Sequence, residues 1–369
     1  MTSFAADSSL TVGLEEELLL VDPETLELAP VAGEVLSAMD AESTAASHEA
    51  YAAQIELRSP PSRAVLEATG TLRSLRSAAG AAGAVLMGAG VHPNARFGEV
   101  ELVPTDRYRE VEESMRGLIR RTPESSLHVH VGMADGEAAI RAFNGLRRHL
   151  PLLQGLSANS PWWYGMDSGL ASGRWALTRP YPGRGIPRAL RDFADWEALA
   201  AVSVAAGGLK DASFLWWDIR LHPTYGTIEV REMDAQSSLE HVAALAALVR
   251  ALACEAIEGT PQEGEPSEAL NWSTFRAARD GVQATILDGG SLRPVAEIAR
   301  ATVARVRPVA RSLGDDDAID GIEQILTEGG GAGRQRASCL RGGLAGMLRT
   351  LVDDTTPTPV APVLEKRPA

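Results

Sequence analysis

The chain has few cysteines and a deficit of positive charge, and each scarcity excludes a class of protein. Its 369 residues include two cysteines, and 35 lysines and arginines stand against 49 acidic residues, for a net charge of −14. Cys254 and Cys339 lie far apart in apolar helical stretches, so we expect buried, reduced thiols rather than a disulfide framework or a thiolate metal site. Nucleic acid is not an expected partner, because phosphate recognition needs a basic face.

Long apolar runs and the familiar nucleotide motifs are also missing. No stretch approaches the roughly 18 apolar residues of a membrane-spanning helix. The first ten residues lack the basic and apolar regions of a secretory signal, so we expect a soluble, cytoplasmic protein with no membrane partner. There is no Walker A sequence, no GxGxxG opening a helix and no kinase signature. A nucleotide would therefore be held mainly through metal ions and arginines.

The order of the segments predicts an α+β fold with an antiparallel sheet, because strands joined by hairpins come first and helices come last. Strands are expected at 11–21, 54–58, 85–90, 126–132 and in the pair within 215–237. Helices are expected at 32–39, 62–84, 108–121, 136–156, 193–206 and throughout 239–351. We expect a flexible stretch at 1–10, one catalytic domain at 11–352 and a disordered Pro/Thr-rich tail at 353–369. Residues 159–187 have no periodicity, which is typical of a functional lid.

The strand pair within 215–237 separates apolar from charged side chains. With a period of two, Asp218, Arg220 and His222 share one face of the first strand, and residues 223–226 form the turn. Thr227, Glu229, Arg231 and Met233 then share one face of the second strand. A solvated sheet face alternates in the same way, so the pair alone leaves its role open.

Three other strands repeat this pattern, and their polar faces carry Glu15 and Glu17, Gln54, Glu56 and Arg58, and His128 and His130. If the strands share one sheet, four carboxylates meet, and such crowding requires a neutralising cation. Mg²⁺ prefers oxygen ligands and bridges carboxylates to nucleotide phosphates. Arg231 or Arg174 would then balance charge in phosphoryl transfer. A Zn²⁺ or Mn²⁺ hydrolase stays open as an alternative.

Several short motifs, in a fixed order over about residues 11–350, resemble the glutamate–cysteine ligase type 2 group of bacterial carboxylate–amine ligases. They are GLEEE at 13–17, HVHVG at 128–132, SANSP at 157–161, GIP at 185–187, WDIR at 217–220, TIEVR at 227–231, Asn271-Trp272 with Arg276, and RQR at 334–336. Each motif is weak alone, but together and in this order they are specific.

The resemblance implies a glutamine synthetase/guanido kinase-like catalytic fold with a helical C-terminal half, often as a homodimer, that uses ATP and Mg²⁺ (Mn²⁺ possible). It places the metal ligands at Glu15, Glu17, Glu56, Glu229 and His130. It assigns catalysis to Arg231, Arg174 and Glu229. It assigns nucleotide contacts to Arg231, His128, His130, Arg220, Arg276 and Arg334.

The implied reaction is ATP-dependent formation of γ-glutamylcysteine from glutamate and cysteine, as in thiol biosynthesis of the glutathione type. It proceeds through γ-glutamyl phosphate and releases ADP and phosphate. Arg58, and Gly173 beside Arg174, depart from the expected pattern near the substrate. The alternatives are a ligase of the same fold acting on a non-cysteine amine, a guanidino-type phosphotransferase, and a non-catalytic binding protein.

Overall fold

The computed structural model describes residues 9–39, 45–222, 224–260 and 264–357. Its main sheet has the strand order β2-β3-β1-β5-β9-β8, with β4 also pairing with β1, and the pairings are antiparallel. The strands are β1 (Val12–Leu20), β2 (Ala46–His48), β3 (Gln54–Arg58), β4 (Leu86–Met87), β5 (Ser126–Gly132), β8 (Ile219–His222) and β9 (Thr227–Asp234). The predicted α+β class with an antiparallel sheet is confirmed.

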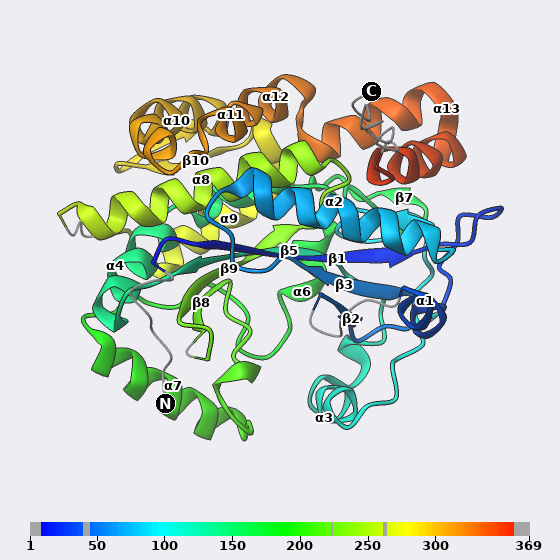
Figure 1. Ribbon diagram of the computed structural model, residues 1–369, viewed down its shortest axis with the longest axis horizontal. Coiled ribbons are helices and arrows are strands. Elements are labelled where there is room, and N and C mark those ends of the chain that lie inside the picture. The colour runs from blue at the N-terminus through cyan, green and yellow to red at the C-terminus, as the bar shows by residue number, and fades with distance from the viewer. Residues whose placement is uncertain (1–8, 40–44, 223, 261–263, 358–369) are drawn as a thin grey trace, which may run out of the picture.

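Alternation along the strands gives the sheet one apolar face. Leu14, Leu57, Val129 and Val230 are fully buried on that face, as the period of two requires. Figure 1 shows α2 (Val65–Ala81) and α8 (Leu239–Glu258) along this side, with α10 to α13 beyond them. The opposite face of the sheet carries most of the charged side chains of the strands, and Glu16 of β1 is an exception that lies on the apolar face.

The remaining elements are mostly helices, and several are shorter than expected. The helices are α1 (Ala32–Ala38), α3 (Asp106–Met115), α4 (Gly136–Arg147), α5 (Leu150–Ser157), α6 (Gly173–Thr178), α7 (Phe193–Gly207), α9 (Ser267–Asp280), α10 (Val295–Ser312), α11 (Asp316–Ile319), α12 (Gly321–Glu328) and α13 (Gly330–Thr355). The helix predicted at 136–156 is divided into α4 and α5, because Pro151 near the start of α5 favours a new first turn.

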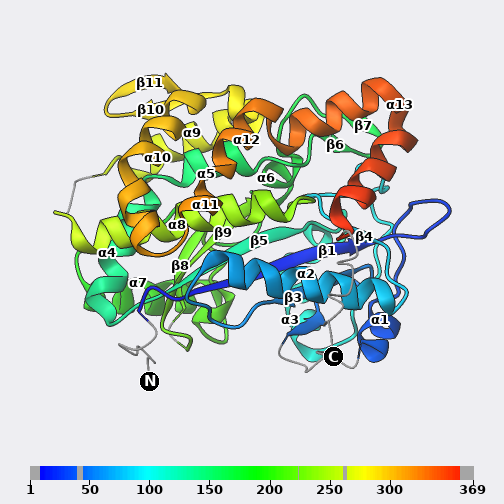
Figure 2. The same ribbon diagram turned by 45° about the horizontal axis from the view of Figure 1, so that its top comes forward.

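The prediction that the chain is made only of helices over 239–351 is wrong at one place. β10 (Thr285–Asp288) and β11 (Ser291–Pro294) form a hairpin, which Figure 2 shows beside α9 and α10. Its two-residue turn is Gly289-Gly290, and both residues have positive φ, the geometry of the tight hairpin turns that glycine favours. The Asp-Gly-Gly sequence was the signal that the helical pattern of its neighbours obscured.

The segment at 159–187 is folded rather than an open lid. It contains the small hairpin of β6 (Trp162–Trp163) and β7 (Met166–Asp167), followed by α6. Ser172 caps α6 by accepting a hydrogen bond from the backbone N–H of Trp175. Arg174 is consequently held in the interior, where it is 2% exposed.

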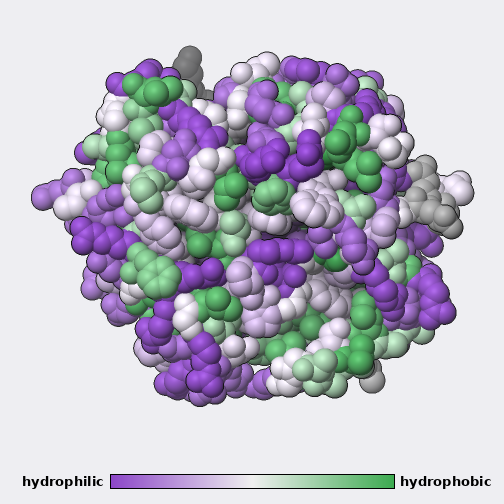
Figure 3. Space-filling model, turned by 180° about the vertical axis from the view of Figure 1, so that it is seen from behind, coloured by the Kyte–Doolittle hydropathy of each residue, from purple (hydrophilic) through white to green (hydrophobic). Residues whose placement is uncertain are grey.

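Smaller predictions have mixed outcomes. Cys254 is buried as expected, but Cys339 is partly exposed. Helix α13 continues to Thr355, a little past the predicted helix end near 351. Residues 1–8 and 358–369 lie outside the described residues. Within the described chain, no helix combines the length and apolar character that a membrane span requires. Figure 3 shows hydrophilic and apolar side chains interspersed over the face that it presents.

Candidate active site

The charged face of the sheet opens into a cavity of about 400 Å³. Of the predicted site residues, eight line it: Glu15, Glu17, Glu56, His128, His130, Arg174, Arg220 and Arg231. Glu229 is fully buried, with its carboxylate against Arg220 and Arg231. The structure thus brings together nine of the eleven residues that the sequence selected.

Strand register explains this convergence. Glu15 on β1 lies opposite His128 on β5, and Glu17 lies opposite Glu56 on β3. On the other side of β5, His130 lies opposite Glu229 on β9. Because directly opposed residues point to the same face, pairs that are distant in sequence meet at adjacent positions. β1 is an interior strand between β3 and β5, so its carboxylates are not edge decoration.

A bulge in β9 adjusts one of the predicted faces. Leu127 pairs with Met233 and Val129 pairs with Val230, so Arg231 and Glu232 together oppose the single residue His128. Such a bulge reverses the alternation beyond it. The prediction that Met233 shares the polar face is therefore wrong, since its side chain lies in the apolar core.

In the part of the chain that the structure describes, three groups of side chains could each hold a metal ion. Their ligand atoms lie within 4.8 Å of one another in Glu15/Glu56/His128, Glu15/His130/Glu229 and Glu17/Glu49/Glu56. Glu49 was missed, because it lies in the loop between β2 and β3, where strand alternation gives no signal. Carboxylate oxygens are the donors that Mg²⁺ prefers.

His130 supports the presence of a cation in the second group. Its Nδ1 is 3.0 Å from the hydroxyl of Thr227, which fixes the ring. Its Nε2 is buried without a hydrogen-bond partner, 3.6 Å from Glu15 and 3.7 Å from Glu229. An orphaned buried nitrogen aimed between two carboxylates, with its other nitrogen held by a neighbour, is typical of a metal-ligating histidine. The donor set therefore fits a divalent cation.

The carboxyl groups at one end of the cavity have raised pKa values, and those at the other end have lowered ones. Burial, with the neighbouring charge of Glu124, raises the pKa of Glu17 to about 8. Burial, with the charge of Glu15, raises the pKa of Glu56 to about 7. Burial also holds the pKa of Glu49 well above its ordinary value, with Glu17 adding to the effect. The three carboxyl groups at this end of the cavity therefore repel one another when they are ionised, and a bound metal ion would relieve that repulsion.

The other end holds ionised carboxylates. Burial would raise the pKa of Glu229, but Arg220 and Arg231 outweigh it and hold the pKa well below its ordinary value. Nε of Arg220 donates to Glu229 at 2.6 Å, and Arg231 forms an ion pair with the same carboxylate. Burial, followed by the charge of Arg231, lowers the pKa of His128 to about 3, so this imidazole is neutral and able to act as a ligand.

Arg174 enters the cavity from helix α6. Its Nε donates to Glu124 at 2.8 Å, and Nη1 donates to the backbone oxygen of Glu232 at 3.0 Å. Glu124, in the loop before β5, is a second lining residue that strand alternation could not reveal. Arg174 is therefore a fixed positive charge at the acidic end, and not an arginine on a moving lid.

Two predicted arginines lie elsewhere. Arg276 donates to the backbone oxygen of Thr285, and Arg334 forms ion pairs with Glu328 and Asp354. Neither lines the cavity. In the structure, both arginines make local contacts in the helical half of the chain.

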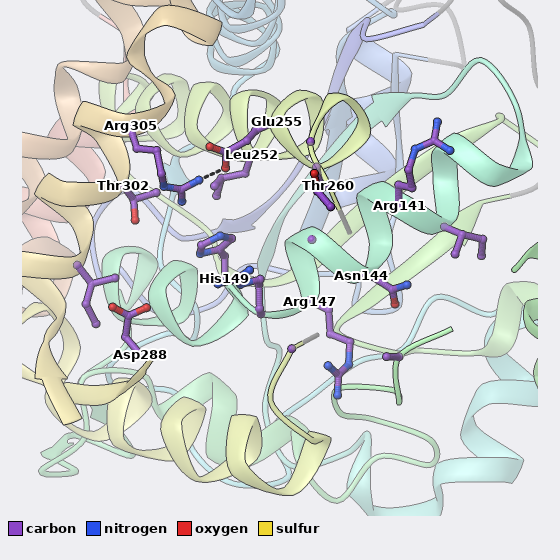
Figure 4. A pocket seen from close by; sticks show the side chains of 18 of the residues that line it. Arg141, Asn144, Arg147, His149, Leu252, Glu255, Thr260, Asp288, Thr302 and Arg305 are labelled. Atoms are coloured by element: carbon purple, nitrogen blue, oxygen red, sulfur yellow. Dashed lines mark hydrogen bonds and ion pairs between the residues drawn. The ribbon is translucent and has the colours of Figure 1, made fainter. Parts of the chain in front are cut away.

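A larger cavity of about 1050 Å³ lies among α4, α8 and α10, away from the charged sheet face (Figure 4). None of the predicted site residues lines it. Its arginines already have partners: Arg305 is paired with Glu255, and Arg147 donates to the backbone oxygen of Pro187. Size alone therefore does not identify the active site.

Comparison with known proteins identifies the family of the chain. The family model described as glutamate-cysteine ligase family 2 matches residues 11–353. A Halobacterium salinarum protein named glutamate–cysteine ligase is 33% identical over 345 residues, covering 90% of this chain and 93% of its own. A Rubrobacter xylanophilus relative, whose name assigns it provisionally as glutamate–cysteine ligase 2-1, is 38% identical over 339 residues and covers 89% and 90%.

Solved structures share the fold at low identity. The Francisella tularensis glutamate–cysteine ligase, solved in complex with AMP, has a TM-score of 0.65 at 12% identity, over 94% of this chain and 88% of that one. The Pasteurella multocida bifunctional glutathione synthetase has a TM-score of 0.64 at 14% identity, over 94% and 51%. The predicted fold class is confirmed, and the chain belongs to glutamate–cysteine ligase family 2, a family of ATP-dependent ligases that form carbon–nitrogen bonds.

Proposed function

We propose that this ligase joins the γ-carboxyl group of glutamate to the amine of cysteine, giving γ-glutamylcysteine, ADP and phosphate. The observation that carries the proposal is the pair of ligand groups that share Glu15, beside Arg220 and Arg231 on the same sheet face. Such a face can neutralise and align several anions at once. The family description and the name of the Halobacterium salinarum relative supply the substrates.

The two ends of the cavity differ in charge, and we assign the nucleotide to one end and the amino acids to the other. Arg220 and Arg231 lie on β8 and β9 beside the Glu15/His130/Glu229 group, and we assign the nucleotide phosphates to this end. Glu17, Glu49 and Glu56 form the other end with Arg174, and we assign the amino acids to it. When bound, Mg²⁺ would neutralise phosphate and carboxylate oxygens between these ligands.

The chemistry requires position and charge more than side-chain nucleophiles. A γ-carboxylate oxygen attacks the γ-phosphorus of ATP, and the bond to ADP breaks. The acceptor amine then attacks the acyl carbon, loses a proton and expels phosphate. Arg231 and Arg220 would stabilise the negative charge on the phosphoryl oxygens during the first step. Glu229 forms ion pairs with both guanidinium groups and holds them in place.

The acceptor is tested with the acid held constant. ADP release from ATP and Mg²⁺ should require glutamate and rise with cysteine, and mass spectrometry should find γ-glutamylcysteine. Release that needs glutamate and another amine would keep the ligase chemistry and reject cysteine. ADP formation with a phosphorylated guanidine and no amide would instead support the phosphotransferase alternative.

A further inference from the structure

Two aromatic side chains form a stack at the rim of the active-site cavity. The rings of His222 and Tyr225 have centroids 4.2 Å apart and planes inclined by 8°. His222 ends β8, and Tyr225 lies in the turn before β9. Both line the cavity, and their centroids are 6.0 and 6.1 Å from that of the candidate ligand His130. The stack therefore borders the Glu15/His130/Glu229 group directly.

The exposure of Tyr225 calls for an explanation. Its side chain is 59% exposed, whereas Tyr51 and Tyr181 in the same cavity are 3% and 8% exposed. Tyr51 also donates its hydroxyl to the backbone oxygen of Ile119, as a packed core residue does. Among the aromatic residues that line this cavity in the described chain, Tyr225 is the one that presents a largely open ring. Charge neutralisation at the metal-ligand groups makes no use of it.

We propose that His222 and Tyr225 form a stacking platform for the base of the nucleotide, an inference that rests on the proposed ligase function. Arg220 and Arg231 come from the same two strands and lie at the same end of the cavity. With phosphates held there, the nucleoside extends toward the rim, where the aromatic pair lies. Base–aromatic stacking needs only a π-face, so the platform contributes affinity without selecting one base by hydrogen bonds.

His222 is a positioning residue in this arrangement. Stacked against one side of Tyr225, it restricts the tyrosine to an orientation that leaves the other side for a ligand. The platform is thus built before nucleotide arrives, which reduces the entropy lost on binding.

The test compares binding of Mg·ATP with binding of Mg·tripolyphosphate by calorimetry on the full chain. Tripolyphosphate keeps the charges and lacks the base. Tyr225→Ala should raise the Kd for Mg·ATP about tenfold and leave the Kd for Mg·tripolyphosphate nearly unchanged. Tyr225→Phe, which keeps the ring, should bind both as wild type does.

Phe97→Ala is the matched control, because Phe97 is 66% exposed and lies outside the cavity lining. It should change neither Kd. Unchanged Mg·ATP binding in Tyr225→Ala, or equal weakening for both compounds, would overturn the platform while leaving the ligase proposal standing. A wild-type protein that bound neither compound would overturn both.

Discussion

Glu16 of β1 and Arg76 of α2 form a two-point ion pair on the face of the sheet opposite to the candidate site. Nε and Nη2 of Arg76 donate to the two carboxylate oxygens of Glu16 at 2.9 and 2.7 Å, and both residues are 1% exposed. Arg76 also donates to the backbone oxygens of Gln236 and Ser237. Three consecutive glutamates thus have two different tasks, since Glu15 and Glu17 face the cavity while Glu16 joins β1 to α2.

This division predicts opposite phenotypes for neighbouring glutamates. Glu16→Ala leaves a buried guanidinium without its carboxylate, and we expect it to lower the free energy of unfolding by about 3–5 kcal/mol. Glu15→Gln should lower the stability of the metal-free protein by less than Glu16→Ala does, and it should remove most ligase activity. Urea denaturation and ADP release, measured on both variants, check the pair. An active, stable Glu16→Ala would show that the ion pair has little structural weight.

Arg231→Lys tests the phosphate end. Lysine keeps the charge but cannot reproduce a planar, two-point grip, so we expect kcat/KM to fall by about 10²–10³. Arg276→Lys is the matched control, because Arg276 lies outside the cavity and should retain near-wild-type turnover. The reverse ranking of the two variants would place the nucleotide in the helical half of the chain.

Arg174→Gln should affect stability and activity together. The substitution leaves Glu124 and the backbone oxygen of Glu232 without their buried donor, at a cost of about 3–5 kcal/mol in the free energy of unfolding. Thermal unfolding and ADP release measured on one preparation check this. Full stability with lost activity would instead indicate direct contact with substrate.

Metal binding should release protons and strengthen as pH rises. The pKa of Glu17 is raised to about 8 and that of Glu56 to about 7, so the metal-free native state holds more protons than the unfolded state between their ordinary values and these. Stability of the metal-free protein consequently falls as pH rises through this window. Mg²⁺ needs the deprotonated carboxylates, so its stabilising effect should be larger at about pH 8.5 than at about pH 6.

Thermal unfolding with and without Mg²⁺ at the two pH values measures this linkage. Calorimetry in buffers with different ionisation enthalpies counts the protons released. A stabilisation by Mg²⁺ that did not change with pH would show that Glu17 and Glu56 are not ligands.

Strand alternation was sufficient to select most of the site, because a sheet brings residues of equal parity to one face whatever their separation in sequence. It failed for Glu49 and Glu124, which come from loops, and for Met233, where the β9 bulge reverses the parity. Arg174 was among the predicted residues, but its burial depends on helix α6, and the sequence pattern gave no sign of that helix.

The helical half was less predictable in detail. The β10–β11 hairpin depends on two glycines inside an otherwise helical pattern. Arg276 and Arg334 belong to family motifs, yet their contacts are with Thr285, Glu328 and Asp354. A motif match could not distinguish these local contacts from ligand contacts. The domain limits at 11–352, the homodimer and the cytoplasmic location stay predictions.

The most direct test of the account follows the oxygen atoms of glutamate. With both γ-carboxylate oxygens labelled with ¹⁸O, the ligase should transfer one labelled oxygen to each phosphate released with γ-glutamylcysteine, because the carboxylate attacks ATP and the amine later expels phosphate. The Glu229→Gln variant should release almost no labelled phosphate. Dipeptide formed together with unlabelled phosphate would contradict activation of the carboxylate by phosphoryl transfer at this site.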